Sequence, residues 1–360
     1  MGSSHLPQPN VLAPLPHDAA DAAFREPPDT SGSPSFPPLP QTPQHTRNQS
    51  GQLTTYIPVP LAFPAPVAVG PILAAALESR WESYREQLCR CQEKFSEGAV
   101  HELRVATRRL LAQFTLLSCV VPRAGLEKAR RILKRRLAAL GDLRDTQVQR
   151  LFIEQEAARF PELVLLLAWL HRRERRLAKA AAEKVNRFKT RKLERWTSAM
   201  IRALTANARR SRVQRRLASA VLRAAGQAFA EAVERRQAID LADLRTIHQT
   251  RVAFKRFRYI LESLSPGITG LSKRQLRALA HYQRKMGIIQ DLEVMHACVT
   301  QYAQGNKKRT ALLQRFSRHL RQRRARALRS FLKSADRLYE FWPPAGLAAQ
   351  GDSVPTRNAA

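Results

Sequence analysis

Two stretches of the chain repeat one pattern: VHELRVATRRLLA at residues 100–112 and IHQTRVAFKRFRYI at residues 247–260. Each places basic residues at the spacing of successive helical turns. In the first copy, His101, Arg104 and Arg108 fall on one side of a helix, and the apolar residues fall on the opposite side. The second copy has the same two faces. A helix needs only its apolar face to pack, so the basic face requires an explanation of its own.

The repeat extends beyond these two helices. A Gly-x-x-x-Asp-x-x-Val segment follows each copy, with Gly141 and Asp145 in the first and Gly287 and Asp291 in the second. The distance along the chain between matching residues is nearly constant, which indicates an internal duplication. We therefore expect two tandem four-helix bundles with pseudo-two-fold symmetry, each long enough to have its own core.

Apolar periodicity predicts that the rest of the repeated region is helical as well. Pro122, Pro161 and Pro266 lie at the ends of periodic runs, where helices begin or end. The fold class is all-α. The expected helices are, in order, 72–95, 100–118, 124–158 and 161–186 in repeat one (about 72–186), a connector near 190–208, and 213–238, 242–264, 271–303 and 308–340 in repeat two (about 213–340).

The two ends of the chain differ from the middle in composition. Residues 1–70 hold fifteen of the 22 prolines, among Ser, Gln and Thr, and we expect a disordered Pro-rich tail there. Residues 341–360 are expected to form a short disordered tail. The folded region is therefore predicted to span residues 71–340.

The charge of the chain is strongly positive, with 62 Lys and Arg against 29 Asp and Glu. Only three of the basic residues, Arg25, Arg47 and Arg357, lie outside residues 71–340, so the folded region holds 59 basic against 24 acidic residues, a net charge of +35 against +33 for the whole chain. Self-repulsion of this size destabilises a compact fold, and a polyanionic partner would relieve it.

Other classes of protein find little support in the sequence. The four cysteines, Cys89, Cys91, Cys119 and Cys298, form neither a disulfide framework nor a well-spaced metal site. We see no apolar run long enough to cross a membrane and no ordinary secretory signal. The expectation is a soluble cytoplasmic protein without a metal or cofactor.

Basic residues recur at helical spacing on further helices, mostly opposite the leucines. Solvated helix faces usually mix charges of both signs, whereas these rows are almost entirely positive. A row of solvated side chains remains the alternative to a binding surface. The candidate polyanion-binding residues outside the two motif helices are Lys128, Arg131, Arg135, Arg172, Arg175, Arg176, Arg274, Arg277, His281, Arg284 and Arg318.

The motif histidines and aspartates also allow two readings. His101 and His248 have cationic neighbours, which disfavours metal binding, and no nucleophile lies at helical spacing from them. We expect them to donate hydrogen bonds to phosphate oxygens, with a structural role between the bundles as the alternative. Asp145 and Asp291 are expected to pair with arginines and orient them rather than to form a catalytic pair.

The duplicated His-x-x-Arg-Val-x-x-Arg/Lys-Arg motif, with its following Gly-x-x-x-Asp-x-x-Val segment, resembles the CHAD family of conserved-histidine α-helical domains. The resemblance covers about residues 72–340. It implies two four-helix bundles with basic residues and motif histidines lining a central pore or groove. It also implies binding of inorganic polyphosphate, association with polyphosphate granules, and no enzymatic activity of the domain itself. The residues that match the motif are His101, Arg104, Arg108, Arg109, His248, Arg251, Lys255 and Arg256, and Arg258 extends the second copy.

The chain departs from a strict duplication at several places. Leu111 and Ala112 stand where the second copy has Arg258 and Tyr259, and Arg144 is matched by Gln290. The expectation is either that the second repeat binds more tightly at that point or that the two copies share the ligand unequally.

Two other functions compete with polyphosphate binding. An RNA- or DNA-binding protein could use the same basic surface, but Phe114, Phe254 and Phe257 fall on apolar faces and offer no stacking platform for bases. A polyphosphatase or phosphotransferase would need an acidic metal-binding cluster or a phosphate-cradling glycine loop, and we find neither.

Overall fold

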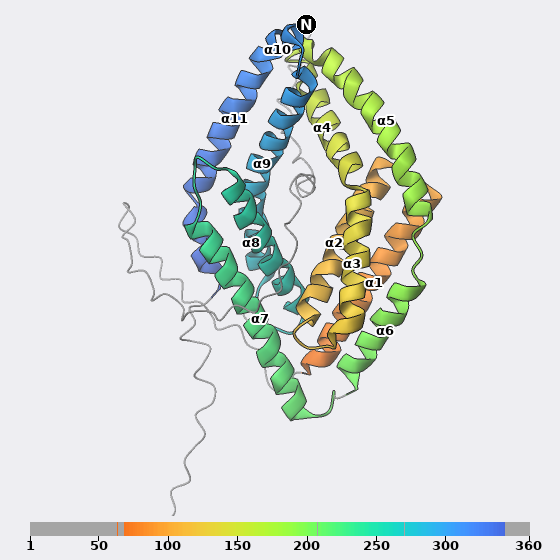
Figure 1. Cartoon of the computed structure of the whole chain (residues 1–360). Coiled ribbons are helices and arrows are strands. Elements are labelled where there is room, and N and C mark those ends of the chain that lie inside the picture. Colours follow the sequence, from red (N-terminus) through yellow and green to blue (C-terminus); the bar gives the residue numbers. More distant parts are fainter. Residues whose placement is uncertain (1–62, 64–67, 207, 270, 343–360) are drawn as a thin grey trace, which may run out of the picture.

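The computed structural model describes residues 63, 68–206, 208–269 and 271–342. The described residues form helices and no β-strand, as expected for the predicted all-α class (Figure 1). The predicted tails lie almost entirely outside these residues. The helices are, in order, α1 (Val69–Glu93), α2 (Glu97–Leu117), α3 (Arg123–Ala139), α4 (Gly141–Ala157), η2 (Pro161–Leu163), α5 (Val164–Asn186), α6 (Arg191–Thr205), α7 (Ser211–Gln237), α8 (Arg245–Leu264), α9 (Lys273–Ala303), α10 (Lys307–Leu312), α11 (Gln314–Leu332) and η3 (Ala335–Phe341).

The predicted helix 124–158 is broken into α3 and α4 at Leu140, which was not expected. In an unbroken helix the carbonyl of Leu137 would accept from the backbone N–H of Gly141. Instead it accepts from the N–H of Leu140 at 3.3 Å and from the guanidinium of Arg104 at 2.8 Å. The corresponding segment of repeat two runs unbroken through α9. A second unexpected break, at Leu313, divides the predicted helix 308–340 into α10 and α11.

Helix packing follows the same order in the two halves of the chain. Helix α1 packs on α2 as α7 packs on α8, and α4 packs on α5 as α9 packs on α11. The connector α6 packs on α1. Figure 1 shows α8, α9 and α11 along one side of the molecule and α1 to α6 along the other, with α10 at the top and the junction of α6 and α7 at the bottom.

The two halves of the chain share their apolar cores, because each core cluster contains residues of both repeats. The larger cluster joins side chains of both repeats, among them Leu77 and Phe114 with Phe254 and Phe257. The smaller cluster lies near the top in Figure 1 and joins residues of α4, η2 and α5 to residues of α9 and α11. The halves thus contact each other at both ends, which fixes their relative position. The description of the halves as tandem four-helix bundles stays a prediction.

Candidate polyanion-binding surface

The two motif helices lie against each other, since α2 packs on α8. Helix α2 starts where the side-chain oxygen of Ser96 accepts from the backbone N–H of Ala99 at 3.3 Å, a regular N-cap. This start places His101 in the second turn of the helix. The duplicated motif therefore lies where repeat one meets repeat two.

Four of the motif side chains are covered by protein. Arg104 is 2 % exposed, Arg108 5 %, Arg251 0 % and His248 8 %. The alternative of freely solvated faces is wrong for these residues. The periodicity of one helix reveals its apolar face, but it cannot show that neighbouring helices will also cover the opposite face.

The remaining motif residues are partly or fully accessible. His101 and Lys255 are half-buried, and Arg109 is exposed. Arg256 is also exposed and forms an ion pair with Glu231 at 3.0 Å. Arg258 donates to the side-chain oxygen of Gln283 and to Glu262, both at 2.8 Å, and its guanidinium lies 4.7 Å from the ring centre of Tyr259. Protein groups therefore already hold part of the basic motif.

Outside the motif helices, the predicted basic rows are exposed. Within the described residues, none of these side chains forms an ion pair or a side-chain hydrogen bond. Basic side chains of this kind are found on α3, α5, α9 and α11. They comprise Lys128, Arg131, Arg135, Arg172, Arg175, Arg176, Arg274, Arg277, His281, Arg284 and Arg318.

On α9, the exposed row faces away from the core. Its members Arg274, Arg277, His281 and Arg284 are exposed, whereas the intervening Leu279 is buried. From the first to the last, the row spans about 15 Å at 1.5 Å per residue. The arrangement can bind several anionic groups of one extended ligand at once. Whether the rows of different helices join into one continuous channel stays a prediction.

Asp145 lies on α4 near the buried motif arginines. Burial raises the pKa of its carboxyl to about 7, although the positive charges of Arg104, Arg108 and Arg173 act in the opposite direction. One carboxylate oxygen, Oδ1, is buried and accepts no hydrogen bond from the described residues. No ion pair between Asp145 and these arginines is seen among the described residues, so the expected pairing stays a prediction. The counterpart Asp291 is buried on α9.

The motif histidines have different surroundings. Burial lowers the pKa of His248, and the charge of Arg251 lowers it further, while a hydrogen bond with the side chain of Gln290 acts in the opposite direction. The imidazole of His101 lies 3.9 Å from the carboxylate of Glu102. At neutral pH His248 is therefore a neutral group inside a positively charged region.

Two further arginines near the motif helices, Arg144 and Arg150, were not among the predicted site residues, and both bind Glu97 of α2. Arg144 is 3 % exposed and donates to Glu97 at 3.3 Å. Arg150 forms ion pairs with Glu97, Glu154 and Glu174, and thereby ties together α2, α4 and α5. The sequence signals for Arg144 were its position next to Asp145 and its mismatch with Gln290. For Arg150 the sequence offered only Glu154, four residues away on the same helix, because Glu97 and Glu174 lie on two other helices.

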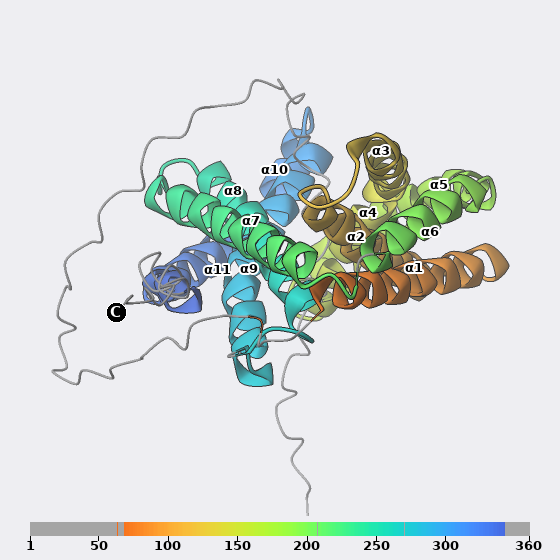
Figure 2. The ribbon, with the colours of Figure 1, turned by 90° about the horizontal axis from the view of Figure 1, so that it is seen from below.

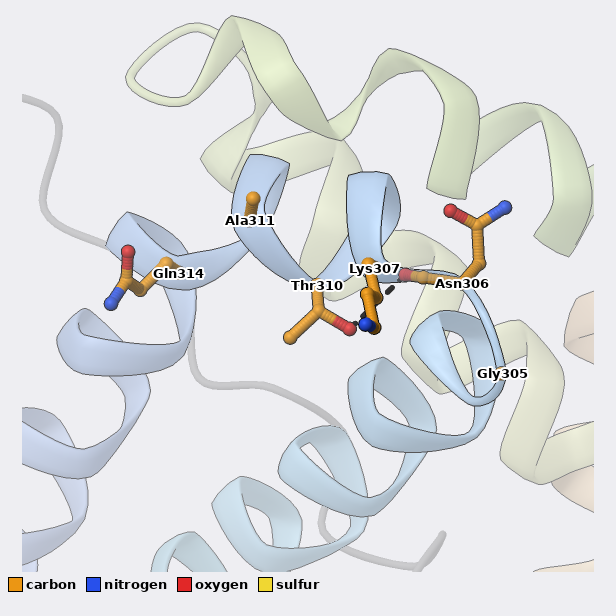
Figure 3. A pocket seen from close by; sticks show the side chains of 6 residues that line it. All are labelled: Gly305, Asn306, Lys307, Thr310, Ala311 and Gln314. Carbon is orange, nitrogen blue, oxygen red and sulfur yellow. Dashed lines mark hydrogen bonds between the residues drawn. The ribbon is translucent and has the colours of Figure 1, made fainter.

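The described residues contain a pocket but no metal cluster and no membrane-spanning helix. Among the described residues, no three His, Cys, Asp or Glu side chains are grouped so that they could hold a metal ion. None of the described helices is long and apolar enough to cross a membrane. An open pocket of about 550 Å³ lies where α9 meets α10, between Gly305 and Gln314 (Figure 3). Lys307 is its single charged lining residue, and the pocket is remote from the motif helices.

Comparison with known proteins identifies relatives of this fold. The family model described as CHAD domain matches residues 73–300. The crystal structure of the CHAD domain from the plant Ricinus communis is similar, with a TM-score of 0.50 and 21 % identity, over 79 % of this chain and 93 % of that one. PptA from Streptomyces chartreusis is similar with a TM-score of 0.53 and 17 % identity, over 74 % of this chain and 99 % of that one. At these identities the likeness concerns the fold alone. No curated protein matches the chain.

Proposed function

The chain belongs to the CHAD domain family, and from this premise we propose that it binds inorganic polyphosphate through its basic helix faces. In this proposal the protein binds the polymer without changing it chemically. Binding would take the protein to polyphosphate granules in the cytoplasm. The alternative is that RNA or DNA occupies the same surface.

One observation carries this proposal: the exposed rows of cations on α3, α5 and α9 lack counter-charges among the described residues. Clustered cations without counter-charges repel one another and destabilise the fold. A linear polymer of phosphate groups would remove this repulsion, and arginine guanidinium groups match phosphate oxygens with two parallel hydrogen bonds.

The buried motif residues support the same proposal through their charge. Arg104, Arg108 and Arg251 lie inside the protein, where solvent screens their charge less than at the surface. Their field adds to that of the exposed rows. In this role they need no direct contact with the polymer, whereas His101, Lys255 and Arg109 are accessible enough for contact.

The aromatic residues favour polyphosphate over single-stranded nucleic acid. Phe114, Phe254 and Phe257 are all fully buried, as the sequence analysis predicted. Non-specific binders of single strands stack bases on exposed aromatic rings beside a basic groove. The motif helices offer no such phenylalanine.

A competition assay tests the proposal. Labelled long-chain polyphosphate would be titrated with the protein at near-physiological salt, then challenged with unlabelled polyphosphate, RNA or DNA at equal charge concentration. We expect polyphosphate alone to compete efficiently, and no phosphate to be released from the polymer. Equal competition by RNA would overturn the proposed preference.

Variants locate the surface. We expect the simultaneous replacement of Arg274, Arg277 and Arg284 by Gln to weaken polyphosphate binding at least tenfold. The salt dependence of binding should also become shallower. The matched control replaces Lys94, Arg235 and Lys333 by Gln, which removes the same charge from exposed positions without ion pairs among the described residues. Equal loss in both variants would mean that net charge alone, and not the α9 row, determines binding.

A further inference from the structure

The junction of α6 and α7 carries a second basic surface that the function proposed above does not use. Between Glu194 and Glu231 the chain contains no Asp or Glu, and all of its basic residues there are arginines. Arg195 and Arg202 lie on α6, Arg209 and Arg210 in the turn, and Arg212, Arg215, Arg216 and Arg223 on α7. We call these eight residues the basic corner.

All eight side chains of the basic corner are exposed. Within the described part of the chain, none of them forms an ion pair or a side-chain hydrogen bond. By contrast, Arg236 and Arg256, near the far end of α7, are paired with Asp336 and Glu231. The corner therefore concentrates unneutralised charge, which destabilises the protein when nothing is bound.

The basic corner lies apart from the α9 row. The junction of α6 and α7 is at the bottom of Figure 1, at the opposite end from α10, and Figure 2 views the molecule from this end. Helices α6 and α7 pack mainly on α1 and α8, and α6 also contacts α3. Among the described residues, neither helix packs on α11 or carries part of the α9 row, so a ligand could bind here independently of the α9 row.

The backbone of the corner is held in place by the start of α1. The side-chain oxygen of the buried Gln214 accepts from the N–H of Gly70 at 2.8 Å. A Cβ at Gly70 would lie 2.3 Å from the carbonyl oxygen of Leu204, so only glycine permits this close approach of α1 and α6. The arginines thus project from a fixed scaffold, and little ordering of the backbone is required when a ligand binds.

The chemistry of the corner identifies the kind of partner. Among the described residues 191–230 there is no exposed large apolar side chain that could insert into a membrane. Trp196 packs against Gly125 and is only partly exposed, so it offers no open platform for stacking unpaired bases. The exposed side chains of the corner therefore suit recognition of phosphate groups, without contact to unpaired bases or lipid tails.

We propose that the basic corner binds the phosphate backbone of double-stranded nucleic acid without reading its sequence. From Arg212 to Arg223 the row on α7 spans about 16 Å, and duplex DNA presents one charge per about 1.7 Å of its axis. Such a length of duplex therefore carries about nine negative charges, which outnumber the four arginines of this row, and the other four corner arginines lie beside it on α6 and in the turn. Guanidinium groups suit phosphate geometry, which agrees with the absence of lysine in this segment.

A variant of the corner tests the proposal with the full chain. Arg212, Arg215 and Arg216 would be replaced together by Gln, and binding to a labelled 30-base-pair DNA duplex measured between about 50 and 200 mM salt. We expect at least a tenfold loss of affinity, and a slope of log affinity against log salt that is shallower by about two to three, near 0.9 per lost phosphate contact. The control variant at Lys94, Arg235 and Lys333 should bind duplex DNA within about threefold of wild type.

Two outcomes would overturn this inference. Equal loss of DNA binding in the corner and control variants would mean that only net charge matters. Loss of binding to anionic phospholipid vesicles or to polyphosphate, with DNA binding retained, would mean that the corner serves a different ligand. The proposed polyphosphate function is tested separately, because the α9 triple variant should retain DNA binding through the corner whether or not it loses polyphosphate binding.

Discussion

The guanidinium of Arg104 donates a hydrogen bond of 2.8 Å to the carbonyl oxygen of Leu137, in the last turn of α3. One residue of the duplicated motif therefore helps to end a neighbouring helix. The basic motif thus stabilises the fold in addition to supplying positive charge for a ligand.

We expect the substitution Arg104→Met to lower the free energy of unfolding by about 1–3 kcal/mol, because it leaves the carbonyl of Leu137 without its charged donor in a buried region. Urea denaturation followed by circular dichroism would measure the change. Arg109→Met on the exposed side of α2 is the matched control and should change stability by less than about 0.5 kcal/mol. Equal effects of the two substitutions would contradict a structural role for Arg104.

The raised pKa of Asp145 predicts a pH-dependent stability. In the unfolded chain this carboxyl ionises near its ordinary pKa of 3.8, whereas in the folded protein burial holds the pKa at about 7. Between these values the folded state binds the extra proton, so its stability falls as the pH rises toward 7. The substitution Asp145→Asn removes this effect, and the variant should gain stability relative to wild type from pH 5 to pH 8. Thermal unfolding at several pH values measures it, and a constant difference would contradict the prediction.

The shared cores predict that half of the chain cannot fold by itself. A fragment of residues 68–206 would expose the apolar side chains that α8, α9 and α11 cover in the full chain. We expect the fragment to lack a cooperative thermal transition, whereas residues 63–342 should unfold cooperatively. A fragment with the same transition as the longer chain would show that repeat one has a sufficient core of its own.

Most of the helices could be predicted from the sequence, because an amphipathic helix repeats its apolar residues at its own period. The helix breaks at Leu140 and Leu313 could not be predicted from the sequence. At Leu140 a competing donor, Arg104, comes from another helix, and no pattern within residues 124–158 records its presence.

The candidate surface, like the helices, could be predicted only in part from the sequence. Periodicity placed the basic residues of α2 and α8 opposite the apolar face, and it correctly assigned Phe114, Phe254 and Phe257 to the core. It could not distinguish the buried Arg251 from the exposed Arg277, since both belong to regular basic rows.

The sequence by itself determined the helical class, the duplicated motif and the family, because each depends on residues close together in the chain. Only the tertiary structure decided which arginines are buried, which are paired and which remain without a counter-charge. Burial and pairing depend on helices that are distant in sequence and adjacent in space, such as α2 against α8 and α4 against α5. The same is true of the basic corner, which contains no motif and became visible as a surface only through the position of α6 and α7 at one end of the fold.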